Sequence, residues 1–184
     1  MAKSTQAVRT HPLAGRVSSA AGVALTPAAP AARVSLRADP SNVVALSKAL
    51  GFELPLHPKT SGRNERGRLA AWLGPDEWLV IDEAGDPLAD LAKAKVLHSA
   101  VNISHRNTAI MVTGRGARAT LESGCPQDLG DAAFPVGAAS RTVLGKIEVV
   151  IIRTGETEFR VECWRSFSDY AFTFLSEAAK DCLA

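Results

Sequence analysis

The stretch E-F-R-V-E-C-W-R-S-F-S-D-Y-A-F-T-F-L-S-E-A, Glu158–Ala178, contains the two side-chain patterns that decide the fold class. Up to Trp164, apolar and polar side chains alternate, which is the period of a β-strand whose two faces meet different environments. The apolar face holds Phe159, Val161 and Cys163, and the polar face holds Glu158, Arg160 and Glu162. This alternation predicts an antiparallel sheet with one solvated face.

After this strand the period changes to that of a helix. Ser166 stands three residues before Asp169, which is the spacing of a capping box. Apolar side chains then recur on one side of the expected helix, at Phe167, Tyr170, Ala171, Phe174, Leu175, Ala178 and Cys182. Burying one aromatic side chain stabilises a fold by about 2–3 kcal/mol, so this helix should close the core. A sheet with helices packed on one face gives an α+β class.

The same two periods recur upstream. Further strands are expected at 33–37, 69–73, 78–82, 96–103, 107–113, 138–144 and 146–153. Asp39 and Pro40 predict the start of a helix that Gly51 ends, and short helices are expected near 86–92 and 116–123. We therefore expect one α+β domain over 33–184, built from two packed halves at about 33–95 and 96–184.

Residues 1–32 have a different composition. This segment is rich in Ala, Ser, Thr and Pro and is interrupted by Pro12, Gly15, Gly22, Pro27 and Pro30. Such a segment buries too little apolar surface to order itself alone, so we expect an extended or disordered arm that a partner surface can order. It lacks the continuous apolar region of a secretory signal.

The bulk composition excludes several classes of protein. The chain of 184 residues is 46% hydrophobic and 22% charged, with a formal net charge of +2. This balance is typical of a folded globular protein and gives no field for nucleic acid or a membrane surface. Cys125, Cys163 and Cys182 are scattered, as expected for reduced thiols in the cytoplasm. We expect a cytoplasmic protein that binds neither nucleic acid nor a membrane.

The motifs that resemble catalytic ones fail in their context. G-R-G-A-R-A at 114–119 resembles a dinucleotide fingerprint, but the helix after it runs into the loop G-C-P-Q-D-L rather than a parallel strand. Ser104 and His105 are neighbours on an extended segment, so their side chains point apart. His98 and His105 have no carboxylate at a ligand spacing. We expect no catalytic, cofactor-binding or metal-binding residue in this chain, which favours a binding or assembly module.

Several blocks of the sequence resemble one family and occur in its order. They are G-P-D-E-W-L-V at 74–80, S-H-R-N-T-A at 104–109, residues 114–121, G-C-P-Q-D-L at 124–129, F-P-V-G at 134–137, R-T at 141–142, and W-R-S-F-S-D-Y at 164–170. The region from Arg68 to Leu175 thereby resembles the gamma subunit of heterotetrameric sarcosine oxidase. The seven blocks together make this resemblance specific.

The resemblance implies a non-catalytic gamma subunit with alpha, beta and delta partners. Such a complex oxidatively demethylates sarcosine to glycine, releases hydrogen peroxide and passes the one-carbon unit to tetrahydrofolate. It is an oxidoreductase acting on CH-NH donors. The resemblance places FAD and FMN on beta and its interface with alpha, NAD and tetrahydrofolate on alpha, and zinc on delta.

The same region is more distantly similar to the folate-binding aminomethyltransferase of glycine cleavage, which implies a fold with ferredoxin-like halves. Asn102 stands at the Asp position of its D-x-S turn, and Pro126-Gln127-Asp128 at its T-N-D. A stand-alone folate-binding module is therefore the alternative function, and an assembly protein of another amine oxidase is a second rival.

The candidate residues for contact with partners combine these arguments. Trp and Arg dominate binding energy at interfaces, although aromatic side chains dominate cores equally. The candidates are Trp72, Trp78, Trp164 and Arg165, together with three polar members of the matched blocks, His105, Arg106 and Arg141. The polar three are expected to contact a partner or to fix a turn.

Overall fold

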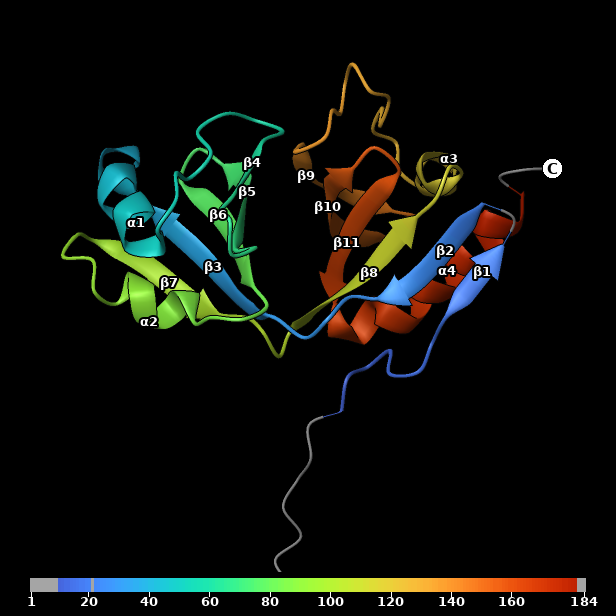
Figure 1. The fold of residues 1–184 in the computed structure, drawn as a ribbon, viewed down its shortest axis with the longest axis horizontal. Coiled ribbons are helices and arrows are strands. Elements are labelled where there is room, and N and C mark those ends of the chain that lie inside the picture. Colours follow the sequence, from blue (N-terminus) through green and yellow to red (C-terminus); the bar gives the residue numbers. More distant parts are fainter. Residues whose placement is uncertain (1–9, 21, 182–184) are drawn as a thin grey trace, which may run out of the picture.

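The computed structural model describes residues 10–20 and 22–181. Two antiparallel sheets face each other, and the helices lie on their outer sides (Figure 1). The chain passes between the sheets twice, before β3 and between β7 and β8, and these two connections lie near each other in Figure 1. The expected α+β class is confirmed, with helices covering one face of each sheet.

The five-stranded sheet has the strand order β4-β5-β6-β3-β7. Its strands are β3 (Ala32–Ala38), β4 (Ser61–Arg63), β5 (Leu69–Gly74), β6 (Glu77–Asp82) and β7 (His98–Asn102). A 3-10 turn at Pro40–Asn42 leads into α1 (Val43–Leu50), and α2 (Pro87–Leu91) lies beside it. The side chain of Asp39 accepts a hydrogen bond from Ser41 N, and Gly51 ends α1 with φ 80°, as the sequence predicts.

The six-stranded sheet has the order β1-β2-β8-β11-β10-β9. Its strands are β1 (Ser18–Ala20), β2 (Val23–Pro27), β8 (Asn107–Thr113), β9 (Ala139–Leu144), β10 (Ile147–Gly155) and β11 (Glu158–Trp164). The helices on its outer face are α3 (Ala117–Glu122) and α4 (Ser168–Asp181), with a 3-10 turn at Arg165–Phe167 before α4. Gly114, between β8 and α3, has φ 108°, and a Cβ there would lie 2.2 Å from the backbone oxygen of Gly22. The G-R-G-A-R-A segment is thus a tight turn against the β1–β2 connection.

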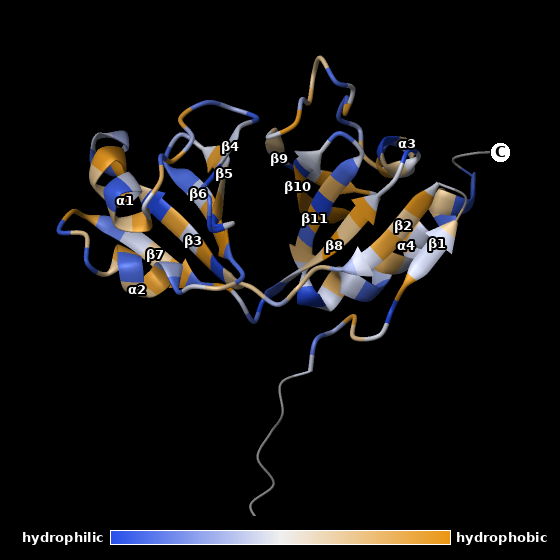
Figure 2. Ribbon diagram, in the orientation of Figure 1, coloured by the Kyte–Doolittle hydropathy of each residue, from blue (hydrophilic) through white to orange (hydrophobic). Residues whose placement is uncertain are grey.

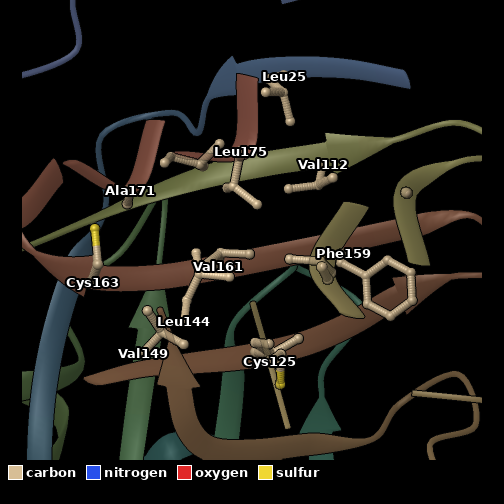
Figure 3. Close-up of a cluster of buried hydrophobic side chains, with 14 of the residues drawn as sticks. Leu25, Val112, Cys125, Leu144, Val149, Phe159, Val161, Cys163, Ala171 and Leu175 are labelled. Carbon is tan, nitrogen blue, oxygen red and sulfur yellow. The ribbon is translucent and has the colours of Figure 1, made fainter. Parts of the chain in front are cut away.

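Three clusters of buried side chains hold the layers together. One lies between the six-stranded sheet and α3 and α4, and a second lies between the five-stranded sheet and its helices. Figure 3 shows part of the first cluster, in which Leu175 of α4 lies beside Val112 and Val161 of the sheet and Ala171 lies beside Cys163. The third cluster joins the two sheets face to face through Leu69, Ala71, Leu79, Ile81, Ala139, Val150 and Ile152. Apolar residues accordingly recur along the strands and helices of both halves (Figure 2).

The N-terminal segment differs from the expected arm. Residues 1–9 lie outside the described part, but β1 and β2 extend the six-stranded sheet, with β2 pairing antiparallel to β8. Leu13 and Leu25 are fully buried in the core of that half. Strand β2 pairs with the edge of β8 that no other strand of the second half occupies, and its alternate apolar side chains enter the core. The sheet therefore buries the apolar surface that the segment could not bury by itself.

The division between the halves also differs from the expected one at about residue 95. Strand β7 pairs with β3 and therefore completes the five-stranded sheet. The second half begins only at β8 and takes β1 and β2 from the start of the chain. The sequence predicts two contiguous halves. Instead, β7 from beyond the expected boundary joins the first sheet, and β1 and β2 from before it join the second.

The apolar face of α4 is rotated from the expected one. Ala171, Phe172 and Leu175 are buried, whereas Phe167 and Tyr170 are exposed. Phe167 lies in the 3-10 turn before α4, which winds more tightly than an α-helix, so it does not continue the apolar face of α4. Within α4 the buried residues are Ser168, Ala171, Phe172, Leu175 and Ala179. Cys182 lies outside the described residues. Within the described part, no helix is both long and apolar enough to cross a membrane.

Candidate partner-binding surface

Four of the predicted interface residues lie together at one corner of the molecule. His105 and Arg106 belong to the turn before β8, and Trp164 and Arg165 lie where β11 ends. These two places meet because β8 and β11 are neighbouring antiparallel strands. The backbone N–H of Arg165 donates to the carbonyl oxygen of Arg106 at 2.7 Å. We call the surface formed by His105, Arg106, Trp164, Arg165 and Phe167 the Trp164 corner.

The Trp164 corner combines exposed aromatic rings with cationic side chains. The guanidinium carbon of Arg106 lies 4.1 Å from the ring centroid of Trp164, and the ring of Phe167 stacks on Trp164 with centroids 6.0 Å apart. Trp164 and Phe167 nevertheless remain 38% and 41% exposed. Phe167 was assigned from the sequence to the buried face of the last helix. Its spacing of three residues from Trp164 is the signal that places the two rings together in a 3-10 turn.

A cavity of about 790 Å³ lies beside this corner, between the two halves. Its lining includes Thr10–Pro12, Asp82–Gly85, Asn102, Ser104 and Arg165. The side-chain oxygen of Asn102 accepts hydrogen bonds from the N–H and the hydroxyl of Ser104, at 3.0 and 2.7 Å. Asn102, which stands at the Asp position of the D-x-S pattern, therefore stabilises the turn that contains Ser104. This part of the cavity wall belongs to the connection between β7 and β8.

Arg141 lies in a second place and has an internal partner. Its guanidinium bonds to the carboxylate of Glu77, which also accepts a hydrogen bond from Arg37 at 2.8 Å. Arg141 is on β9 and Glu77 on β6, so this contact joins the two sheets. Two separate blocks of the matched sequence, G-P-D-E-W-L-V and R-T, thereby meet in an interaction that fixes the halves relative to each other.

The two remaining tryptophans occupy different environments. Trp78 is 1% exposed, lies in the core of the five-stranded half, and donates its ring N–H to Pro55 O at 2.7 Å. The prediction that it contacts a partner is wrong for this conformation, because the side chain already fills the core. Trp72, its cross-strand neighbour on β5, is half-buried.

Between the sheets lies a charged network that the sequence pattern missed. Glu162 accepts hydrogen bonds from Arg33 Nε at 2.6 Å, Arg33 Nη2 at 3.1 Å and Arg160 Nε at 2.9 Å. Arg33, Arg160 and Glu162 are only 3%, 7% and 1% exposed, so the polar face of β11 is covered by the other sheet. The expected solvated face is therefore wrong. Arg160 also binds Glu83 at the margin of the network.

The network alters the ionisation of its neighbours. Burial alone would lower the pKa of Arg160, but the charge of Glu162 and hydrogen bonds to Glu162 and Glu83 outweigh it and raise that pKa. Burial, together with the charge of Glu162, raises the pKa of the Cys163 thiol to about 12. A thiol in this state is not a nucleophile. These groups stabilise the packing of the sheets, and among the described residues no three His, Cys, Asp or Glu side chains gather in a way that would hold a metal ion.

Comparisons with known proteins identify the family. The profile of the sarcosine oxidase, gamma subunit family matches residues 35–181. Sarcosine oxidase subunit gamma of Arthrobacter sp is 32% identical over 166 residues, which span 88% of this chain and 82% of that protein. The corresponding protein of Corynebacterium sp. strain P-1 is 31% identical, over 89% of this chain and 83% of its own length.

Solved structures agree with this assignment. A chain in heterotetrameric sarcosine oxidase from Corynebacterium sp. U-96, in complex with pyrrole 2-carboxylate, superposes with a TM-score of 0.87 at 28% identity. The match covers 96% of this chain and 97% of that one. Aminomethyltransferase T of the glycine cleavage system from Bartonella henselae has a TM-score of 0.63 at 18% identity over 87% of this chain and 49% of its own, which shows a shared fold. The chain belongs to the sarcosine oxidase gamma subunit family.

Proposed function

We propose that this chain is the gamma subunit of a cytoplasmic heterotetrameric sarcosine oxidase and that it supports assembly of the complex. The observation that carries the proposal is the superposition on a chain of heterotetrameric sarcosine oxidase over nearly the whole of both chains, with a TM-score of 0.87 at 28% identity. Sequence similarity of this extent accompanies the shared fold, so the inference rests on more than architecture.

In this complex the chain is a structural partner of alpha, beta and delta subunits. FAD, FMN, NAD, tetrahydrofolate and zinc are held by those subunits, where sarcosine is demethylated to glycine and hydrogen peroxide forms. The chemistry of the described side chains supports this division. The buried ionisable groups Arg33, Arg160 and Glu162 bind one another, and Cys163 is held as a neutral thiol.

The Trp164 corner is the proposed contact with a partner subunit. Its His, Arg and Trp members come from two distant blocks of the matched sequence, which the fold brings to one exposed place. Trp72 and Arg141 are secondary candidates, because Trp72 is half-buried and Arg141 already has an internal partner in Glu77.

The test is co-expression of this chain with the products of its neighbouring genes, followed by affinity purification and a sarcosine-dependent peroxide assay. Recovery of a flavin-containing complex of four chains, active on sarcosine, is the expected result. Omission of this chain should lower the yield of assembled complex, and adding back the purified chain should restore it. If the chain purifies without flavoprotein partners and with bound folate, the subunit function is wrong and the folate-binding module replaces it.

A further inference from the structure

The Trp164 corner has a chemical character that specifies its partner. Trp164 and Phe167 are both among the exposed large apolar side chains, although the core of this half is already filled by residues such as Leu13 and Phe172. These rings are therefore not required to seal the interior. Exposed aromatic side chains grouped on one surface are typical of protein–protein contacts.

The charged members of the Trp164 corner, Arg106 and Arg165, are both cationic. Asp169, two residues after Phe167, forms an ion pair with Arg16. Asp82 and Glu83, which line the adjacent cavity, pair with Arg68 and Arg160. Within residues 10–20 and 22–181, no carboxylate forms an ion pair with Arg106. A surface of this kind is complementary to an acidic partner.

Arg106 is also held in a position that suits a carboxylate. Its guanidinium carbon lies 4.1 Å from the centroid of the Trp164 ring, and its backbone is fixed by the bond from its N–H to Ile103 O at 3.0 Å and by the bond from Arg165 N. A guanidinium over an aromatic ring keeps N–H donors for a bidentate contact with a carboxylate. Because these groups are ordered before binding, the partner does not have to immobilise them.

We infer that another subunit of the complex places an Asp or Glu carboxylate on the N–H edge of Arg106 and an apolar side chain on the rings of Trp164 and Phe167. This inference rests on the proposed function, since it specifies the chemistry of the segment that docks at the corner. The charge pair fixes the orientation of the segment, and the aromatic rings supply the apolar area that leaves water.

The test uses the co-expressed complex and matched pairs of variants. Arg106→Glu is compared with Arg66→Glu, an exposed arginine in the loop between β4 and β5, and Phe167→Ser with Val44→Ser on the exposed side of α1. Affinity of the purified variants for the complex lacking this chain is measured at low and high salt. Arg106→Glu and Phe167→Ser should bind about ten- to hundred-fold more weakly, as expected for losing a charge-assisted contact or a buried aromatic. The two controls should bind as the wild type does.

A second measurement identifies the carboxylate directly. In Arg106→Lys complexes, a carbodiimide should form an amide between the substituted position and an Asp or Glu of another subunit, which peptide mass spectrometry locates. If Arg106→Glu binds with wild-type affinity, or if the substituted position forms no amide with another subunit, the inference is wrong while the subunit function stands. If the wild-type chain does not associate with the other subunits at all, both are wrong.

Discussion

Removing the charge of Glu162 should be among the most damaging single changes in this protein. The substitution Glu162→Gln keeps the shape but places an amide N–H₂ against two guanidinium groups, and it leaves Arg33 and Arg160 buried without a counter-charge between them. Breaking a buried ion pair by removing one partner costs about 3–5 kcal/mol. A domain has about 5–15 kcal/mol of stability in total, so the loss is a large fraction of it.

The assay is thermal unfolding of the purified chain, followed by circular dichroism. For a protein of this size each kcal/mol corresponds to about 2–4 °C, so the midpoint should fall by about 6–20 °C. Glu148→Gln on the exposed side of β10 is the matched control and should leave the midpoint within about 2 °C.

A triple replacement separates the charge effect from packing. Arg33→Met, Arg160→Met and Glu162→Leu together remove both cations with the anion, and replacing a whole buried ionic cluster by apolar side chains is often neutral or stabilising. The triple variant should therefore be more stable than Glu162→Gln alone. A loss below about 1 kcal/mol for Glu162→Gln, or an equal loss in the triple variant, would refute the reasoning.

Three further predictions follow from local geometry. Gly114→Ala should lower the free energy of unfolding in urea by about 1–3 kcal/mol more than Gly137→Ala does. Both glycines have positive φ, but only at position 114 would a Cβ meet a backbone oxygen, at 2.2 Å. Equal losses of stability in the two variants would contradict this. Cys163 should resist alkylation near pH 8 until the chain is unfolded, since its pKa is raised to about 12, and peptide mapping that finds it labelled in the folded protein would disprove the burial. Burial alone would raise the pKa of Asp82, but hydrogen bonds from Arg68 and two backbone N–H groups hold it below 3.8. The stabilisation by the Asp82 carboxylate is thus present above the pKa of the unfolded chain and is lost as pH falls through the lower pKa of the folded chain. The difference in melting temperature between wild type and Asp82→Asn should therefore shrink on acidification below about pH 4. A difference that stays constant would argue against the assignment.

Much of the local structure follows from the sequence because it depends on neighbouring residues. The predicted strands 107–113 and 158–164 coincide with β8 and β11. In β11 apolar and polar residues alternate, and β8 is a short apolar run bounded by turn residues. The helix that Asp39 opens and Gly51 ends is likewise determined by groups within one turn of each end. The family resemblance rests on short blocks of the same kind.

The candidate surface was only partly predictable. The residue types at His105, Arg106, Trp164 and Arg165 drew attention to them, but their assembly at one corner depends on the pairing of β8 with β11. Phe167 was placed on the wrong face because the 3-10 turn before α4 changes the angle between successive side chains.

The sequence by itself therefore determined the α+β class, the positions of most strands and helices, and the family. Only the tertiary structure decided which strands pair across the expected boundary and what covers the polar face of β11. The alternation in that strand shows that its two faces differ, but it carries no information on the partner. Glu162 is neutralised in the interior by Arg33, which lies 129 residues away in the chain. A contact at that separation is set by the packing of two sheets, and no local pattern of side chains encodes it.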